Sequence, residues 1–196
     1  MKKLTSALFI IFITFSVKAF AADNEMVKRI SEGKESAKIT IVTYESLTCS
    51  HCADFHKNIY PDLKKEFIDK GLVKIEFRHF PLDIAAFNAS KISQCNNDGK
   101  SDLLHILYSN QPKWVKGSTA KEANDHLKKF LKDKNINIDF EKCTNNKSIE
   151  DYILNDRIEG VQKFKVNATP TIIINNEKFE KSLDYKNLKE SLEKLI

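Results

Sequence analysis

The sequence contains neither a glycine-rich phosphate loop nor the G-x-S-x-G motif of serine hydrolases. The first absence argues against nucleotide chemistry of the P-loop type, and the second argues against a hydrolase with a serine nucleophile. No long segment is depleted of apolar residues either, since 41% of the residues are hydrophobic and 30% are charged. The 196 residues are therefore expected to form a globular protein of one domain, with room for a sizeable insertion.

A strong excess of one charge is also missing, because the formal net charge is only +5. The first 21 residues carry three lysines and no acid, so the remainder of the chain has a formal net charge of +2. Such a small net charge is not typical of a nucleic-acid-binding protein. We expect no nucleic-acid partner.

The N-terminal residues 1–21 have the pattern of a secretory signal peptide. Two lysines precede an apolar run at 7–17, and Ala19-Phe20-Ala21 provides the small residues of a cleavage site. An uncleaved anchor is the alternative, but the run is shorter than the roughly 20 residues of a spanning helix. No cysteine follows Ala21, which argues against a lipoprotein. The sequence therefore predicts export to the periplasm with cleavage after Ala21.

Hydrophobic periodicity predicts an α/β protein. The expected elements, in chain order, are a helical pattern within 22–37, a strand at 38–45, a helix from Cys49 that Pro61 interrupts, a strand at 72–80, helices at about 84–96, 101–110, 120–134, 139–145 and 148–164, strands at 171–175 and 177–181, and a helix at 184–196 capped by Asp184.

This order predicts a mixed central sheet flanked by helices. A strand–helix–strand unit favours a parallel crossover, and the short turn near Asn176 favours an antiparallel hairpin. Residues 22–82 and 166–196 are expected to form the main domain, and residues 83–165 an inserted helical subdomain.

Cys49-Ser50-His51-Cys52 lies directly after a predicted strand and at the start of a predicted helix. The free amides and the positive dipole end of a helix stabilise a thiolate at this position. Cys49 is expected to be the nucleophile and Cys52, one turn further into the helix, the resolving thiol. A histidine between them lowers the pKa of the Cys49 thiol further and makes the disulfide more oxidising. An inert structural bridge is the alternative.

The run from Tyr44 to Asp83, together with ATPT at 168–171, resembles the DsbA-like branch of the thioredoxin superfamily; it reads YESLTCSHCADFHKNIYPDLKKEFIDKGLVKIEFRHFPLD. The resemblance implies a thioredoxin-like fold and a thiol–disulfide oxidoreductase that forms disulfide bonds in exported proteins. It assigns Pro170 as a cis-proline beside the active site, with Thr169 before it, and both as substrate-binding residues. It also implies reoxidation by a quinone-linked membrane protein, and we expect no cofactor and no bound metal.

Two positions depart from the family pattern. Relatives usually have a buried acid six residues before the first active cysteine, where this chain has Thr43. Glu45 lies on the same side of the strand, nearer to the turn. It either substitutes for that acid or is a solvated loop acid. Ser50 replaces the proline of CPHC sequences, which leaves the reduction potential open.

Cys95 and Cys143 have no neighbouring cysteine and no helix-start context. In an oxidising compartment a mutual disulfide is the simplest interpretation. A disulfide between these cysteines, which are 48 residues apart in the sequence, would stabilise the fold by roughly 4 kcal/mol in the chain-entropy model. Two free buried thiols are the alternative.

Two other functions fit the same cysteines. His56 and His79 could join Cys49 and Cys52 in a metal site of a metal-binding chaperone, although the spacing is not that of a zinc finger. A disulfide isomerase or a reductase would use the same dithiol, and Thr169 resembles the isomerase branch. Those isomerases need an N-terminal dimerisation region that residues 22–37 are too short to form, so we expect a monomeric oxidase. His105 and His126 are expected to have no role, and Trp114 to pack from a loop.

Overall fold

The computed structural model describes residues 26–196, so the predicted signal peptide at 1–21 lies outside the described residues. A five-stranded sheet forms the centre of the molecule, in the order β1-β3-β2-β4-β5. The strands are β1 (Ile30–Glu32), β2 (Ile39–Glu45), β3 (Val73–His79), β4 (Thr171–Ile174) and β5 (Glu177–Lys178). The central strand β2 pairs in parallel with β3 and antiparallel with β4, so the sheet is mixed as the sequence predicts.

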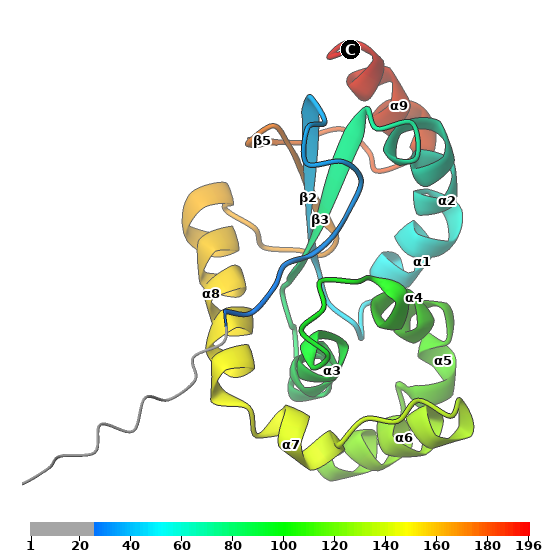
Figure 1. The fold of residues 1–196 in the computed structure, drawn as a ribbon, viewed down its shortest axis with the longest axis vertical. Coiled ribbons are helices and arrows are strands. Elements are labelled where there is room, and N and C mark those ends of the chain that lie inside the picture. The colour runs from blue at the N-terminus through cyan, green and yellow to red at the C-terminus, as the bar shows by residue number, and fades with distance from the viewer. Residues whose placement is uncertain (1–25) are drawn as a thin grey trace, which may run out of the picture.

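Helices cover both faces of this sheet (Figure 1). One face is covered by α1 (Ser50–Asn58), α2 (Tyr60–Leu63), the π-helix Lys64–Ile68 and α9 (Tyr185–Glu193), and the other by α8 (Lys147–Phe164). Alternation along β2 explains both layers. Ile39 and Ile41 belong to the core under α1 and α9, whereas Val42 and Tyr44 pack with Phe164 of α8.

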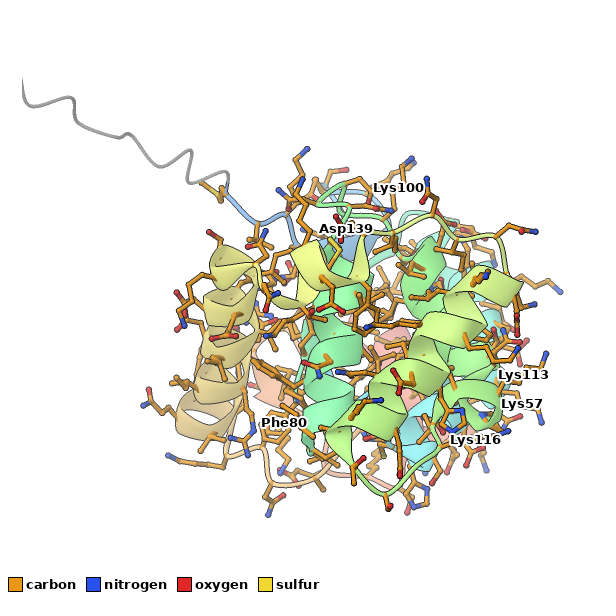
Figure 2. All side chains as sticks on the ribbon, turned by 90° about the horizontal axis from the view of Figure 1, so that it is seen from below. Lys57, Phe80, Lys100, Lys113, Lys116 and Asp139 are labelled. Atoms are coloured by element: carbon orange, nitrogen blue, oxygen red, sulfur yellow. A yellow bond between two sulfur atoms is a disulfide. The ribbon has the colours of Figure 1, made fainter. Side chains whose placement is uncertain are left out.

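The remaining helices lie between β3 and α8 in the chain. They are α3 (Ile84–Gln94), α4 (Asp102–Ser109), α5 (Gln111–Trp114), α6 (Ala120–Asp133) and α7 (Phe140–Thr144). Cys95 and Cys143 form a disulfide that ties the end of α3 to α7, with their Cα atoms 5.5 Å apart. Figure 2 shows α3 between α8 and α6. Among residues 26–196, no helix has the length and apolar character needed to cross a membrane.

Local signals define several helix ends. Asp184 caps α9 by accepting a hydrogen bond from the Asn187 amide, as predicted. Thr119 and Glu122 form a reciprocal capping box at the start of α6. Such caps satisfy backbone amides that have no partner within the helix.

The prediction of a helical pattern in residues 22–37 is wrong for Ile30–Glu32, which form β1. This segment pairs antiparallel with β3 and buries Ile30 to 1% exposure. Pairing with a sheet edge therefore outweighs the local helical spacing. Trp114 is not in a loop but ends the short helix α5, and its indole N–H donates to the Leu107 carbonyl at 2.8 Å.

Asp156 attaches α8 to the sheet. The Arg29 side chain donates to both carboxylate oxygens of Asp156 at 2.6 Å, and the His79 backbone amide donates to one of them at 3.2 Å. Close packing accompanies this attachment, because a Cβ atom at Gly160 would lie 2.8 Å from Cε1 of Tyr44.

We predict that Gly160→Ala destabilises the protein despite the better helix propensity of alanine. The methyl group would overlap the Tyr44 ring, and such overpacking costs about 1–3 kcal/mol, more than the gain of at most about 1 kcal/mol in propensity. Urea unfolding measures the difference. Asn155→Ala, at an exposed position of the same helix, is the control and should be neutral or slightly stabilising. A Gly160→Ala protein as stable as the control would contradict the close packing.

We predict that Cys95→Ser/Cys143→Ser lowers the free energy of unfolding by about 4 kcal/mol, because the unfolded chain loses its covalent loop. The single variant Cys143→Ser should lose about the same amount. Denaturant unfolding of the oxidised proteins tests this, and equal midpoints for the unmodified and double-variant proteins would show that the bridge does not stabilise the fold.

Candidate active site

The loop after β2 places Cys49 at the N-cap of α1. The Cys49 amide donates to the Ser46 carbonyl at 3.0 Å, and the Gln111 side chain donates to the carbonyls of Leu47 and Cys49 at 2.9 Å each. Gln111 thus holds the loop from the helical layer, a role that its sequence context does not reveal. Both Cys49 and Cys52 are in the free thiol form.

The two cysteines differ sharply in access to solvent. Cys49 is partly exposed, whereas Cys52 is 0% exposed. An external thiol or disulfide can therefore approach only Cys49. The roles of Cys49 as the nucleophile and Cys52 as the resolving thiol stay predictions, and this difference in access is consistent with them.

The segment before β4 lies against Cys49. The Thr169–Pro170 peptide bond is cis, and the Cys49 thiol donates to the Thr169 carbonyl at 3.3 Å. Thr169 and Pro170 also line a cleft of about 510 Å³ with His51, Phe55 and Tyr185. The Cys49 thiol thus contacts a residue that lines this cleft.

Hydrogen bonds lower the pKa of the Cys49 thiol to about 5. The Cys52 thiol contributes most, partial burial opposes the shift, and the Thr169 side chain and the backbone amides of Cys52 and His51 add to it. The His51 ring is exposed, so the described contribution of this residue is that of its amide. A catalytic role for the ring stays a prediction.

The pKa of the Cys52 thiol is raised far above its ordinary value. Burial is the main cause, followed by the hydrogen bond to Cys49 and then by the negative charge of Glu45. At neutral pH the reduced site therefore holds one thiolate, at Cys49, and one thiol, at Cys52.

Glu45 is not a solvated loop acid, and that alternative is wrong. The residue ends β2, is 3% exposed, and its Oε2 lies 2.7 Å from Nε2 of His56. Burial disfavours the carboxylate, but the charge and hydrogen bond of His56 outweigh it, so the pKa of Glu45 lies below its ordinary value. Thr43 is fully buried, and its hydroxyl lies 3.4 Å from the Glu76 carbonyl.

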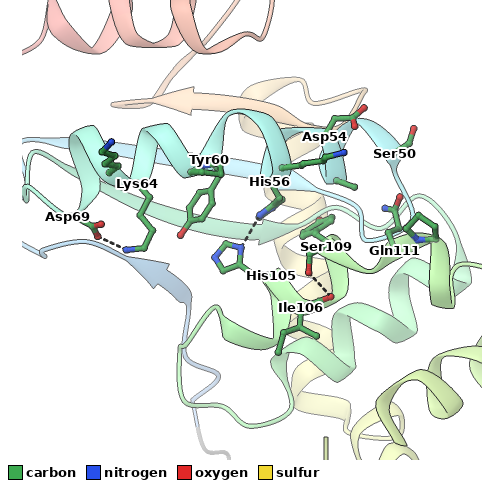
Figure 3. A pocket seen from close by; sticks show the side chains of 16 residues that line it. Ser50, Asp54, His56, Tyr60, Lys64, Asp69, His105, Ile106, Ser109 and Gln111 are labelled. Carbon is green, nitrogen blue, oxygen red and sulfur yellow. Dashed lines mark hydrogen bonds and ion pairs between the residues drawn. The ribbon is translucent and has the colours of Figure 1, made fainter. Parts of the chain in front are cut away.

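His56 and His79 do not join the cysteines in a metal site. The second ring nitrogen of His56, Nδ1, lies 3.0 Å from Nδ1 of His105 (Figure 3). The ring of His79 is buried and lies 3.4 Å from Oε1 of Gln94. Within residues 26–196 no three histidine, cysteine or acidic side chains are grouped so that they could hold a metal ion.

His105 has contacts that its sequence context does not reveal. Its Nε2 lies 2.7 Å from Glu32, which also accepts hydrogen bonds from Tyr60 and Ser101. His105 lies on α4 and Glu32 on β1, far from Cys49 in the sequence. The helical spacing of α4 marks His105 as a helix-surface residue and cannot show which side chain it meets.

Comparison with known proteins assigns the family. The thioredoxin family model matches residues 25–194. The chain belongs to the thioredoxin family. It is 30% identical over 175 residues to disulfide bond formation protein D of Bacillus subtilis, covering 83% of this chain and 74% of that protein.

Solved structures of this family share the fold. Alpha-DsbA1 of Wolbachia pipientis superposes with a TM-score of 0.74 at 28% identity, over 88% of this chain and 94% of that one. Oxidised BdbD of Bacillus subtilis superposes with a TM-score of 0.66 at 26% identity, over 85% of this chain and 92% of that one. Within the thioredoxin family this chain is a DsbA-like thiol–disulfide oxidoreductase.

We predict that thiolate absorbance of the reduced protein titrates with a midpoint near 5, and that Cys49→Ala removes this transition. The folded state also lowers the Cys49 pKa below that of the unfolded chain, so ionisation stabilises the reduced fold above the unfolded thiol pKa, and this stabilisation is lost as pH falls through about 5. Cys52 stays a thiol in both states below pH of about 8 and does not contribute.

The stability of the reduced protein relative to the oxidised protein should therefore rise between pH of about 5 and about 8. Urea unfolding of both forms at several pH values measures it. A stability difference that does not change over this range would mean that Cys49 is not selectively ionised in the fold.

Proposed function

We propose that this chain is an exported dithiol oxidase that introduces disulfide bonds into reduced proteins in the periplasm. The observation that carries the proposal is the asymmetry of the cysteine pair. Cys49 is accessible and has a pKa of about 5, and Cys52 is inaccessible and held as a thiol. A stable Cys49 thiolate stabilises the reduced form and makes the disulfide a strong oxidant.

The reaction follows from which sulfur is accessible. A substrate thiolate attacks Sγ of Cys49 in the oxidised protein, the Cys49–Cys52 bond breaks, and the Cys52 sulfur takes up one proton. A second substrate thiolate then attacks the substrate sulfur of the mixed disulfide. Cys49 leaves as a thiolate, so the substrate gains a disulfide and the two cysteines are left reduced.

The cleft beside Cys49 is the proposed substrate site. Thr169 and Pro170 would position an extended peptide there, with the Thr169 backbone close to the mixed disulfide. The exposed His51 ring lies at the same cleft and would act on the leaving Cys49 sulfur together with its amide.

The N-terminal pattern and the relatives support the cellular setting. Residues 1–21 have the features of a cleaved signal peptide. A relative is named disulfide bond formation protein D. We propose that the protein acts as a monomer and that a quinone-linked membrane protein reoxidises it.

A reduction potential separates an oxidase from the reductase and isomerase alternatives. We predict a value for the Cys49–Cys52 pair near that of DsbA, about −120 mV, rather than that of thioredoxin, about −270 mV. Equilibration in glutathione buffers measures it. The oxidised protein should also oxidise reduced, unfolded ribonuclease A at one disulfide per molecule, and Cys49→Ala should abolish this.

The matched variant Cys52→Ala should instead accumulate a mixed disulfide through Cys49, because the resolving thiol is missing. A potential near that of thioredoxin, with efficient rearrangement of scrambled ribonuclease A, would reject the oxidase in favour of a reductase or isomerase.

A further inference from the structure

Four buried or partly buried side chains form a continuous hydrogen-bonded chain behind Cys52. Glu45 contacts His56, His56 contacts His105, and His105 contacts Glu32, at 2.7, 3.0 and 2.7 Å. They come from β2, α1, α4 and β1, so the fold and not the local sequence brings them together. None of them is needed to explain why Cys49 is reactive.

The bonds in this chain fix how many protons it holds. Hydrogen bonds from His105, Ser101 and Tyr60 outweigh partial burial and hold the pKa of Glu32 at about 2, and the pKa of Glu45 is lowered as well. Both acids are therefore carboxylates, and each needs a proton on the Nε2 atom that faces it.

The contact between Nδ1 of His56 and Nδ1 of His105 needs one further proton, since two bare nitrogens would repel each other at 3.0 Å. Three protons on four ring nitrogens make one of the two rings an imidazolium. The pair thus carries one positive charge between two carboxylates.

Each end of the chain meets a different environment. At the inner end, Glu45 precedes Ser46, whose backbone bonds to the Cys52 sulfur, and it contacts His56, one helical turn beyond Cys52, so its negative charge acts on that thiol. Glu45 is thus the buried carboxylate whose charge acts on the Cys52 thiol, which makes it the candidate acceptor of that proton.

At the outer end, the His105 side chain is 26% exposed and lines a cavity of about 870 Å³ beside α1 and α4 (Figure 3). His56, Tyr60 and Tyr108 line the same cavity. Figure 2 shows Lys57 and Lys113 projecting to solvent on one side of the molecule, and Lys57 also lines the cavity.

We propose that Glu45, His56, His105 and Glu32 form a proton relay that connects the Cys52 sulfur to water in the cavity beside α1. The inference rests on the proposed exchange reaction. When the disulfide is reduced, the Cys52 thiolate takes one proton through Glu45 and the histidine pair regains one from water. When Cys52 attacks a mixed disulfide, it gives its proton to Glu45, Cys49–Cys52 forms, and the external thiolate leaves. His56, His105 and Glu32 are positioning residues, because they act through Glu45.

Several other groups surround this relay and set its charge balance. They are Cys52 and Tyr60 on the active-site helices, Lys64 on the π-helix, His79 on β3, and Asp102 and Tyr108 on α4. Tyr108 stacks on His56 with ring centroids 4.1 Å apart, which fixes the plane of the ring.

The proton count can be measured without any reaction. Nitrogen-15 NMR of the reduced protein at neutral pH should show three protonated ring nitrogens on His56 and His105 together, assigned with His56→Gln and His105→Gln. Only two protonated nitrogens, one on each ring, would overturn the proposal.

The relay itself is tested by stopped-flow reaction of the reduced protein with stoichiometric 5,5′-dithiobis(2-nitrobenzoate). Attack by Cys49 releases the first thionitrobenzoate, and resolution by Cys52 releases the second. Without a second imidazole to share the charge, Glu45 becomes protonated over a higher pH range and cannot accept a proton. In His105→Gln the second phase should therefore slow as pH falls below the raised pKa of Glu45, by up to about tenfold for a rise of one pKa unit, and should recover as pH rises above it.

Glu32→Gln keeps the shape of its side chain but removes the outer charge, and it should shift the second phase in the same direction. His126→Gln, an exposed histidine on α6, is the matched control and should leave both phases unchanged. A second phase with the same pH profile in His105→Gln and the unmodified protein would overturn the relay. Loss of the first phase in the unmodified protein would instead reject the proposed function, and the NMR count would still decide the relay.

Discussion

The pairing of β2 with β3 on one side and β4 on the other places every part of the active site. The end of β2 carries Glu45 and leads into the loop that presents Cys49 at the start of α1. The antiparallel pairing of β2 with β4 sets Tyr44 opposite Thr171, so the Thr169–Pro170 segment reaches the same edge of the sheet. A shift of one residue in this register would turn alternate side chains to the opposite face and separate Thr169 from Cys49.

The difference between the two thiols follows from this placement. At the first turn of α1, backbone amides have no partner within the helix and can bond to the Cys49 sulfur. Three residues later the chain has entered the core, where Cys52 meets apolar side chains and the charge of Glu45. One helical turn therefore separates a sulfur that favours its anion from a sulfur that favours its neutral form. The spacing of Cys49 and Cys52 places one sulfur at the start of the helix and the other in the core, and this difference in environment gives the two thiols different reactivity.

Sequence reasoning predicts those features that depend on neighbours along the chain. The strand at Ile39–Glu45, the helix start at Cys49 and the cap at Asp184 follow from local spacing and side-chain chemistry. The contacts of residues whose partners lie far away in the sequence are harder to predict. The β1 strand exists because it pairs with β3, and no local pattern in the segment around Ile30 distinguishes it from a helix. Gln111 and His105 gain their contacts only when the helical layer folds against α1.

The position of Glu45 shows that one buried charged side chain needs further charged partners. On β2, Glu45 is on the same face as Thr43 but nearer to the turn, and there it meets His56, one turn beyond Cys52. A lone buried carboxylate would take up a proton, so an ionised acid at this position needs a cationic partner.

The partner must itself be satisfied, because an imidazole in the core has two nitrogens and Glu45 occupies only one. His105 meets the second nitrogen, and Glu32 in turn meets His105. The series ends at His105 and Glu32 because both reach partial solvent exposure, where water can screen the remaining charge. Glu45 at the end of β2 thus begins a chain of polar groups that extends from the core to the cavity beside α1.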